Sequence, residues 1–186
     1  MPTIFTHGLT GYTIKKLLKD NPSYLKLTVT SIVCAMLPDA DVIGFAFHIP
    51  YESMFGHRGF THSVFFAVLV AIIVQFTLFR NENLSTKNGK LIFLVIFCST
   101  VSHPIFDMFT NGGHGVALFA PFSNHRYFFP WFRPILVSPI GVDGIFSGYG
   151  LRVLFSELLF IGLPCLFLLV LKKVWPLKDE RKTVSK

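Results

Sequence analysis

The residues best suited to chemistry in this sequence are imidazoles, carboxylates and a guanidinium that border apolar segments. His57, Arg58 and His62 fall within seven consecutive residues that run directly into the uncharged segment 64–79. Charged and imidazole groups at the end of a membrane helix are costly to place there and usually serve a function. We therefore interpret this stretch as a source of ligands for a metal site at a membrane surface.

Further candidate ligands border other apolar segments. Asp39 and Asp41 follow Pro38 at the end of one segment, where the alternative is a pair of solvated acids at a helix end. His103 and Asp107 are spaced i, i+4 near the end of another segment and share one helix face. This spacing lets both side chains reach one metal, or lets the carboxylate orient the imidazole. An unpaired carboxylate in such a position would be expensive.

His57 and His62 are five residues apart and would not share the face of one helix. If a helix begins with Thr61 as its N-cap, His57 lies before it and can fold back toward His62. The alternative is a pair of interfacial histidines that are hydrogen-bonded to the backbone. Arg58 could hold a phosphate bidentately, or could pair with one of the two aspartates after Pro38.

His7, early in the first apolar stretch, is a weaker candidate ligand. Ser63 and Ser102 could orient ligands, and Glu157 could face the site, pair with Arg152 or reach toward the membrane surface. We could place no partners for the remaining histidines, which are His48, His114 and His125.

The composition indicates one membrane domain over residues 1–186. Hydrophobic residues make up 52% of the chain, and its mean hydropathy is +0.57. The net charge of +7 resides in particular loops, so we interpret it as a signal of membrane topology and expect no nucleic-acid partner. Cys34, Cys98 and Cys165 lie in apolar segments and predict neither a disulfide nor a thiolate zinc site. We expect no cleavable signal peptide.

The apolar segments predict an all-α, multi-pass membrane helical bundle. Residues 61–79, 91–109 and 151–171 are long enough to cross a bilayer, since about 20 residues are needed. Residues 4–18 and 25–37, separated by a turn at 21–23, are too short to cross alone. They could form a tilted hairpin, or the second could extend through 42–47. We expect Pro104 to kink or restart its helix, and the loop 110–150 to lie at the membrane interface.

The basic residues divide the ends of these segments into two groups. The basic stretches 15–26, 80–90 and 172–186 fall on one side of an antiparallel bundle, and the positive-inside rule makes that side cytoplasmic. The basic C-terminal tail from about residue 172 is therefore cytoplasmic. The candidate ligands all fall at the opposite, outward-facing helix ends, although the charge argument made no use of their positions.

A set of imidazoles and carboxylates without thiolates suits zinc, with manganese or iron as alternatives. Such a divalent metal can lower the pKa of a bound water molecule, and two metals can clamp both oxygens of a displacement at phosphorus.

Three blocks of sequence carry a resemblance to a known family. Leu37-Pro38-Asp39-x-Asp41, His57-Arg58-Gly59-x-Thr61-His62-Ser63 and Ser102-His103-x-x-x-Asp107-x-x-Thr110 occur in order. They resemble the YdjM-like family of bacterial inner-membrane, predicted metal-dependent hydrolases. That family is similar to the zinc-dependent phospholipase C and single-strand nuclease superfamily, which hydrolyses phosphodiesters at an α-helical site with two or three metals.

The resemblance implies roles for particular residues. Asp39, His62, His103 and Asp107 would hold one metal, and His7 would contribute to a second metal with Asp107 as the bridge. The later ligands of the soluble relatives have no clear match here, unless His114 or Glu157 substitutes.

These arguments predict a hydrolase of the bacterial cytoplasmic (inner) membrane that uses a metal-activated water on a phosphate ester, such as a lipid head group at the membrane surface. His57 and Asp41 would be additional ligands or would support the ligands, and Arg58 would be a phosphate clamp. The alternative from another class is a non-enzymatic metal transporter or sensor with the same ligands. A third alternative is a scaffold in which hydrogen bonds satisfy the histidines.

Overall fold

The structure, a computed structural model, describes residues 1–18, 25–138, 144 and 147–175. The described elements, in chain order, are α1 (Ile4–Leu17), α2 (Leu25–Met36), the 3₁₀ helices η1 (Leu37–Phe47) and η2 (Phe60–His62), α3 (Val64–Leu78), α4 (Lys87–Met108), α5 (Gly148–Glu157), the π-helical turn η3 (Leu158–Gly162) and α6 (Leu163–Val174). The described residues contain isolated β-bridges but no named strand, so the all-α prediction is confirmed.

Three continuous helical segments are long and apolar enough to cross a membrane: Leu25–Phe47, Lys87–Met108 and Gly148–Val174. The apolar helix α3 has 15 residues and is shorter than the membrane-crossing segment predicted over 61–79, because the residues before Val64 form the turn η2 and the loop that precedes it. For residues 25–37 the sequence left open a tilted hairpin with residues 4–18 or an extension through 42–47. In the structure the helical segment extends to Phe47. The predicted turn at 21–23 and the basic tail beyond 175 lie outside the described residues.

The predicted N-cap of α3 is wrong, and one of the two alternatives for Pro104 is excluded. Ser63, not Thr61, is the N-cap of α3, and its hydroxyl accepts a hydrogen bond from the Phe66 N–H. Thr61 lies in η2 and donates its hydroxyl to Asp41 instead. Pro104 does not restart its helix, because α4 continues through it to Met108.

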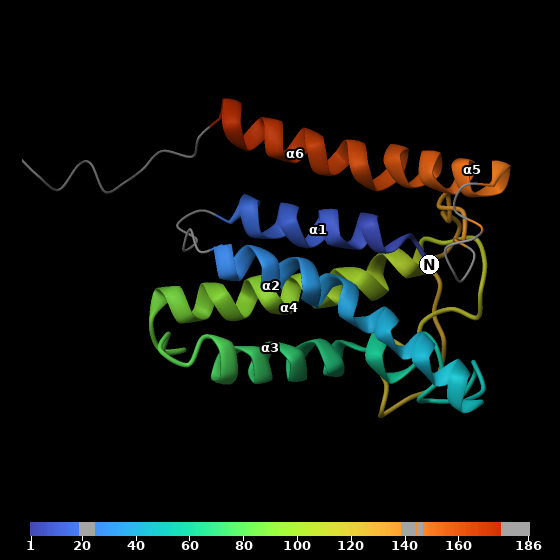
Figure 1. The fold of residues 1–186 in the computed structure, drawn as a ribbon, viewed down its shortest axis with the longest axis horizontal. Helices are drawn as coiled ribbons and strands as arrows, with labels where there is room; N and C mark the ends of the chain where they lie inside the picture. The colour runs from blue at the N-terminus through green and yellow to red at the C-terminus, as the bar shows by residue number, and fades with distance from the viewer. Residues whose placement is uncertain (19–24, 139–143, 145–146, 176–186) are drawn as a thin grey trace, which may run out of the picture.

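The helices lie side by side along the long axis of the molecule, with α1 between α6 and α2 (Figure 1). Small residues bring α1 and α2 close together. A Cβ atom added to Gly11 would lie 2.4 Å from the Ser31 carbonyl oxygen, so the close approach of the two backbones requires glycine there. The buried core lies where α2, α3 and α4 meet, and includes Leu27, Val70 and Ile96.

The two ends of the bundle differ in chemistry. The C-terminal ends of α1, α3 and α6 and the start of α4 lie at one end, where the basic residues Lys16, Arg80, Lys87 and Lys172 are found (Figure 1). Lys172 Nζ donates to the carbonyls of Lys16 and Leu18, which ties α6 to α1. The start of α1, the end of α4 and η1 lie at the other end, as the sequence predicts for the candidate ligands.

A buried carboxylate attaches the last membrane segment to the start of the first helix. Glu157, at the end of α5, accepts hydrogen bonds from the Thr3 N–H at 2.6 Å, the Thr3 hydroxyl at 2.5 Å and the Thr6 hydroxyl. Thr3 is the N-cap of α1, so this negative charge also lies at the favourable end of the helix dipole. The pairing of Glu157 with Arg152 that the sequence suggested is not made.

We expect Glu157→Ala to lower the free energy of unfolding by about 3 kcal/mol, because each buried donor left unpaired costs about 1–3 kcal/mol. Thermal unfolding in detergent should show a midpoint lower by roughly 6–12 °C. Glu52→Ala is the matched control, since the Glu52 side chain is 64% exposed. Equal midpoints for the two variants would contradict the structural role of Glu157.

Candidate metal centre

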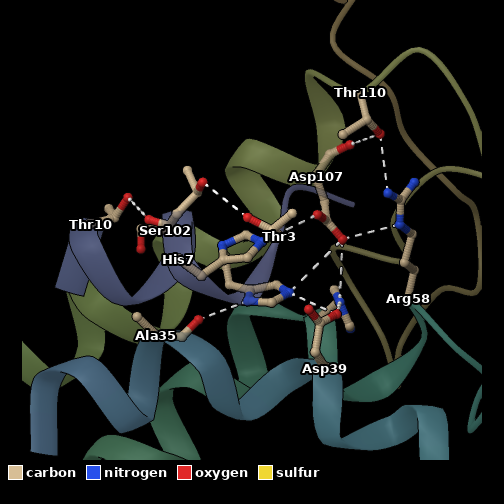
Figure 2. A network of polar contacts seen from close by, with 12 residues as sticks. Thr3, His7, Thr10, Ala35, Asp39, Arg58, Ser102, Asp107 and Thr110 are labelled. Atoms are coloured by element: carbon tan, nitrogen blue, oxygen red, sulfur yellow. Dashed lines mark hydrogen bonds and ion pairs between the residues drawn. The ribbon is translucent and has the colours of Figure 1, made fainter. Parts of the chain in front are cut away.

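Four side chains from three elements converge at one end of the bundle. Asp39 comes from η1, His62 from η2, and His103 and Asp107 from successive turns of α4. Each offers one nitrogen or oxygen atom, and these atoms all lie within 4.8 Å of one another. All four residues are buried, and Figure 2 shows Asp39 and Asp107 facing the same space. This group is called the Asp/His cluster below.

The distances within the Asp/His cluster are compatible with one four-coordinate ion. His62 Nε2 lies 3.6 Å from Asp39 Oδ1 and 3.4 Å from Asp107 Oδ2. His103 Nε2 lies 3.2 Å from Asp39 Oδ1 and 4.0 Å from Asp107 Oδ2. Ligand atoms about 2.1 Å from a tetrahedral zinc ion lie about 3.4 Å from one another. The cluster could therefore bind a metal ion.

Within the described part of the chain, the polar atoms that face this space make ion-pair contacts at 3.1–4.0 Å with one another and with Arg58 but have no hydrogen-bond partner. They are His62 Nε2, His103 Nε2, Asp39 Oδ1 and both carboxylate oxygens of Asp107. A buried polar atom without a partner costs about 1–3 kcal/mol, and native proteins contain few of them. Several in one place indicate that a group which would satisfy them belongs there. A cation coordinated by all four side chains fits that requirement.

A backbone carbonyl fixes the orientation of His103. Its Nδ1 lies 2.8 Å from the Ala35 carbonyl oxygen, which can only accept a hydrogen bond. In the 3₁₀ pattern this carbonyl would accept a hydrogen bond from the nitrogen three residues later, which is that of Pro38. Proline has no N–H, so that bond cannot form and the carbonyl is available to His103. Nδ1 therefore carries a proton, and Nε2 faces Asp39 and Asp107.

Asp41 supports the second imidazole of the cluster. Its Oδ2 lies 3.1 Å from His62 Nδ1 and accepts hydrogen bonds from the Thr61 hydroxyl and the Arg58 N–H. Its Oδ1 lies 2.6 Å from His57 Nδ1. A carboxylate behind a histidine in this way sets the tautomer and makes the outer nitrogen a better ligand. Asp41 and His57 thus lie behind His62, and they form a second group of potential ligand atoms with it.

The surrounding charges favour a proton on His62 when no cation is present. Burial by itself disfavours the charged ring, but attraction to Asp107, Asp39 and Asp41 outweighs it and raises the pKa of His62 well above its usual range. Positive charge at this position is therefore stabilised by the three carboxylates.

Arg58 is fully buried and faces Asp107 (Figure 2). Its Nε lies 3.1 Å from Asp107 Oδ2, and its two terminal nitrogens donate to the Gly112 carbonyl and the Thr110 hydroxyl. The loop must come close to reach it, since a Cβ atom on Gly113, at φ +85°, would lie 2.8 Å from the Arg58 Nη1. The guanidinium thus pairs with Asp107, whereas the sequence had suggested a pair with Asp39 or Asp41.

His7 lies on the opposite side of Asp107. Its ring stacks on that of His103 with centroids 3.6 Å apart, and its Nε2 lies 3.7 Å from Asp107 Oδ1. The His62 and His103 imidazoles face the other oxygen, Oδ2. Both ring nitrogens of His7 are buried and lack a hydrogen-bond partner. The two oxygens of Asp107 therefore face two different sets of imidazoles.

Comparison with known proteins identifies the family of the chain. The sequence matches the YdjM inner membrane protein family over residues 1–178. The chain belongs to that family. It is similar to "Inner membrane protein YbcI" of Escherichia coli (strain K12), with 37% identity over 169 residues, which cover 91% of this chain and 95% of the relative. No solved structure matches the chain. The family and the three apolar helices identify an inner membrane protein.

Several predicted residues of this YdjM family member lie away from the cluster. Glu157 is engaged by Thr3 and Thr6, and His114 lies at the surface, 3.4 Å from Glu52. His48 and His125 are exposed. The serines predicted to orient ligands have other partners: Ser63 caps α3, and Ser102 donates to the Ser99 carbonyl.

Three groups that orient the side chains of the site had no predicted role. The Ala35 carbonyl orients His103, and Thr110, although part of the third sequence block, had no assigned role. Arg126 donates to the carbonyls of Tyr51, Ser53 and His57, and so fixes the loop before η2. The position of Arg126 in an aromatic-rich loop could have predicted that it binds backbone carbonyls there. The role of the Ala35 carbonyl could not be predicted, because every residue has a backbone carbonyl.

We expect Arg58→Met to lower the free energy of unfolding by about 3–5 kcal/mol, because it leaves the buried Asp107 carboxylate without its cationic partner. Arg80→Met is the control, since Arg80 is exposed. Thermal unfolding of both variants in the same detergent measures the difference. A stability of Arg58→Met equal to that of the control would show that this ion pair does not hold Asp107.

Proposed function

We propose that the protein is a membrane-bound, metal-dependent hydrolase that uses a metal-activated water on a phosphate ester. The observation that carries the proposal is the convergence of buried ligand atoms of Asp39, His62, His103 and Asp107 that have no hydrogen-bond partner among the described residues. Their types favour zinc, with manganese and iron as the alternatives.

The charge balance around the site supports a divalent cation. Three buried carboxylates, those of Asp39, Asp41 and Asp107, lie at the site with one buried guanidinium, that of Arg58. Burial lowers the pKa of the Met1 amino group, which also lies near Asp107, to about 6, so this amine is largely uncharged at neutral pH. With neutral imidazoles this leaves two uncompensated negative charges in the interior, which is unfavourable. One divalent cation balances them, and in its absence a proton on His62 does so in part.

Each side chain has a defined part in the proposal. A cation held there would supply a hydroxide-like nucleophile near neutral pH and would stabilise negative charge on the phosphate. Asp41 keeps the Nδ1 proton of His62 in place, the Ala35 carbonyl does so for His103, and Arg58 holds the Asp107 carboxylate. Arg58 is thus primarily a positioning residue, and its remaining N–H groups could reach a phosphate oxygen.

His7 extends the proposal to a second cation. Asp107 would offer Oδ2 to the first cation and Oδ1, together with His7, to the second. Two cations on one bridging carboxylate can stabilise the attacking and the leaving oxygens of a displacement at phosphorus.

The position of the site favours an enzyme at the membrane surface over a transporter. Transport sites lie near the midplane between helices with polar groups on both sides. Here the cluster lies at one end of the bundle, and the basic residues lie at the other end (Figure 1). We propose that the basic end, with the C-terminus, is cytoplasmic, so that the site faces outward.

We expect purified protein to contain about one or more equivalents of zinc, and His103→Ala to lose most of that metal, because a four-ligand site loses one ligand and the orientation set by α4. Elemental analysis by mass spectrometry measures the content. His125→Ala is the matched control, since it removes an exposed imidazole outside the cluster. Unchanged metal content in His103→Ala, or metal-free protein after zinc loading, would contradict the metal site.

The hydrolase proposal is tested separately, with metal-loaded protein and a broad panel of phosphate esters. Activity in the unaltered protein and in His125→Ala, together with its loss in His103→Ala, would support the proposal. Full metal occupancy without cleavage of any ester would contradict it and would favour a non-enzymatic metal-binding protein.

Asp41→Asn should weaken zinc binding by about 10–100-fold, the usual effect of removing the carboxylate behind a ligating histidine. Competition with a chromophoric chelator gives the affinity. Glu52→Gln is the matched control, since it removes an exposed carboxylate outside the cluster. An affinity within twofold of the unaltered protein would remove Asp41 from the site.

A further inference from the structure

Exposed aromatic side chains lie at the end of the bundle that holds the Asp/His cluster. Trp131 is fully exposed, Phe122 is 82% exposed, and Phe65, Phe129 and Phe132 are exposed to a smaller extent. These five residues are called the aromatic rim below. A large apolar patch on a protein surface marks an interaction with another protein, a ligand or a membrane.

One part of the aromatic rim lies beside α3. The ring of Phe122 packs edge-on against that of Phe65, in the first turn of this helix, with centroids 5.6 Å apart. The Val64 N–H donates to the Leu118 carbonyl at 3.0 Å, which fixes the loop to the start of the same helix. Phe122 therefore extends the apolar surface of α3 beyond the end of the helix.

The other part lies beside the last membrane segment. The Phe132 ring lies 6.0 Å from that of Phe160, an exposed residue of η3, and 6.3 Å from that of Phe109 at the end of α4. The Phe129 ring stacks on Phe109 with centroids 4.3 Å apart. Trp131, between Phe129 and Phe132 in sequence, is thus held next to a segment that is long and apolar enough to cross the membrane.

The two parts of the aromatic rim lie at opposite edges of the bundle. α3 and the last membrane segment form these edges, and the loop after α4 lies at this end between them (Figure 1). Lipid already surrounds the exposed apolar side chains of both helices in an inner membrane protein. The aromatic rim is therefore continuous with the lipid-facing surface on both sides.

The charge of the loop suits a lipid head group. Residues 109–138 contain two arginines, Arg126 and Arg133, but no aspartate or glutamate. Arg133 is exposed, and its guanidinium lies over the Phe128 ring, 4.9 Å from the centroid. Aromatic rings are favoured at the level of the head groups, where a guanidinium can bind phosphate oxygens. A second copy of this chain would instead bring two cationic loops together.

We infer that the aromatic rim lies in the head-group layer of the membrane and thereby sets the depth of the Asp/His cluster. His62 is three residues before Phe65, and Asp107 is two residues before Phe109, on which Phe129 stacks. One helical turn is about 5 Å, and the head-group layer is about 5–7 Å thick on each side of the hydrocarbon. The cluster therefore lies at the level of the lipid phosphates.

This inference concerns the position of the protein in the membrane and does not rest on the proposed function. The sequence predicts only that the loop 110–150 lies at the interface. The structure adds which side chains enter the head-group layer, and that they lie at both edges of the bundle.

The first test measures the depth of Trp131. The chain has two tryptophans, so Trp175→Phe leaves Trp131 as the only one. The variant is placed in phosphatidylcholine nanodiscs, which are open to solvent on both faces. Some of the lipid carries bromine, either at the start or in the middle of the acyl chains. We expect bromine at the start of the chains to quench the Trp131 fluorescence severalfold more than bromine in the middle, and iodide in solution to quench it little.

Three results would overturn the inference. Strong quenching by iodide without quenching by bromine would place Trp131 in water. Stronger quenching by bromine in the middle of the chains would place it in the hydrocarbon. Quenching by neither would show that protein, such as a second copy of this chain, covers it.

The second test examines the other edge of the bundle. Phe122→Trp, combined with Trp131→Phe and Trp175→Phe, places the only tryptophan beside α3. We expect the same preference for bromine at the start of the chains. His125→Trp in the same background is the reference for a polar part of the loop, since His125 is exposed between Asn124 and Arg126, and iodide should quench it strongly. Quenching of the Phe122→Trp protein by iodide, to the extent seen for His125→Trp, would overturn the inference at this edge.

Discussion

The site depends on a carboxylate buried inside an apolar helical bundle. Asp107 is fully buried within a helix that is apolar enough to cross a membrane, where an isolated negative charge would be strongly unfavourable. Arg58 and His62 lie beside one of its oxygens and His7 beside the other. The chain brings these groups together from α1, from the stretch that contains Arg58 and η2, and from α4. The bundle thus arranges three distant parts of the sequence around a single charge.

Local backbone chemistry gives these side chains their directions. Pro38 changes α2 into the 3₁₀ helix η1 and leaves the Ala35 carbonyl available to His103. Thr61, in the short turn before α3, gives its hydroxyl to Asp41, and Asp41 in turn faces His62. Irregular elements at the ends of regular helices therefore hold the two imidazoles, whereas the regular part of α4 sets only the spacing of His103 and Asp107.

The sequence was sufficient for the fold class and for much of the cluster, because helical periodicity and the cost of charge in apolar segments leave clear patterns. It placed the candidate ligands at one end of the bundle and the basic residues at the other, and the structure has both groups there (Figure 1). It did not predict the partner of Glu157, since Thr3 is 154 residues away and bonds partly through its backbone N–H. The predicted N-cap of α3 was Thr61 and the observed one is Ser63, because both hydroxyls can cap a helix. The Thr61 hydroxyl instead donates to Asp41, and the Ser63 hydroxyl accepts from the Phe66 N–H.

The contact between Glu157 and Thr3 has a consequence for biogenesis. Because Glu157 holds the start of α1, the contact that fixes this helix end forms only after the last membrane segment has been synthesised and inserted. His7 lies one turn beyond Thr3 and moves with it. A nascent chain in which α5 has not yet inserted therefore lacks this contact, and the position of His7 depends on a segment that is translated after every other candidate ligand of the site.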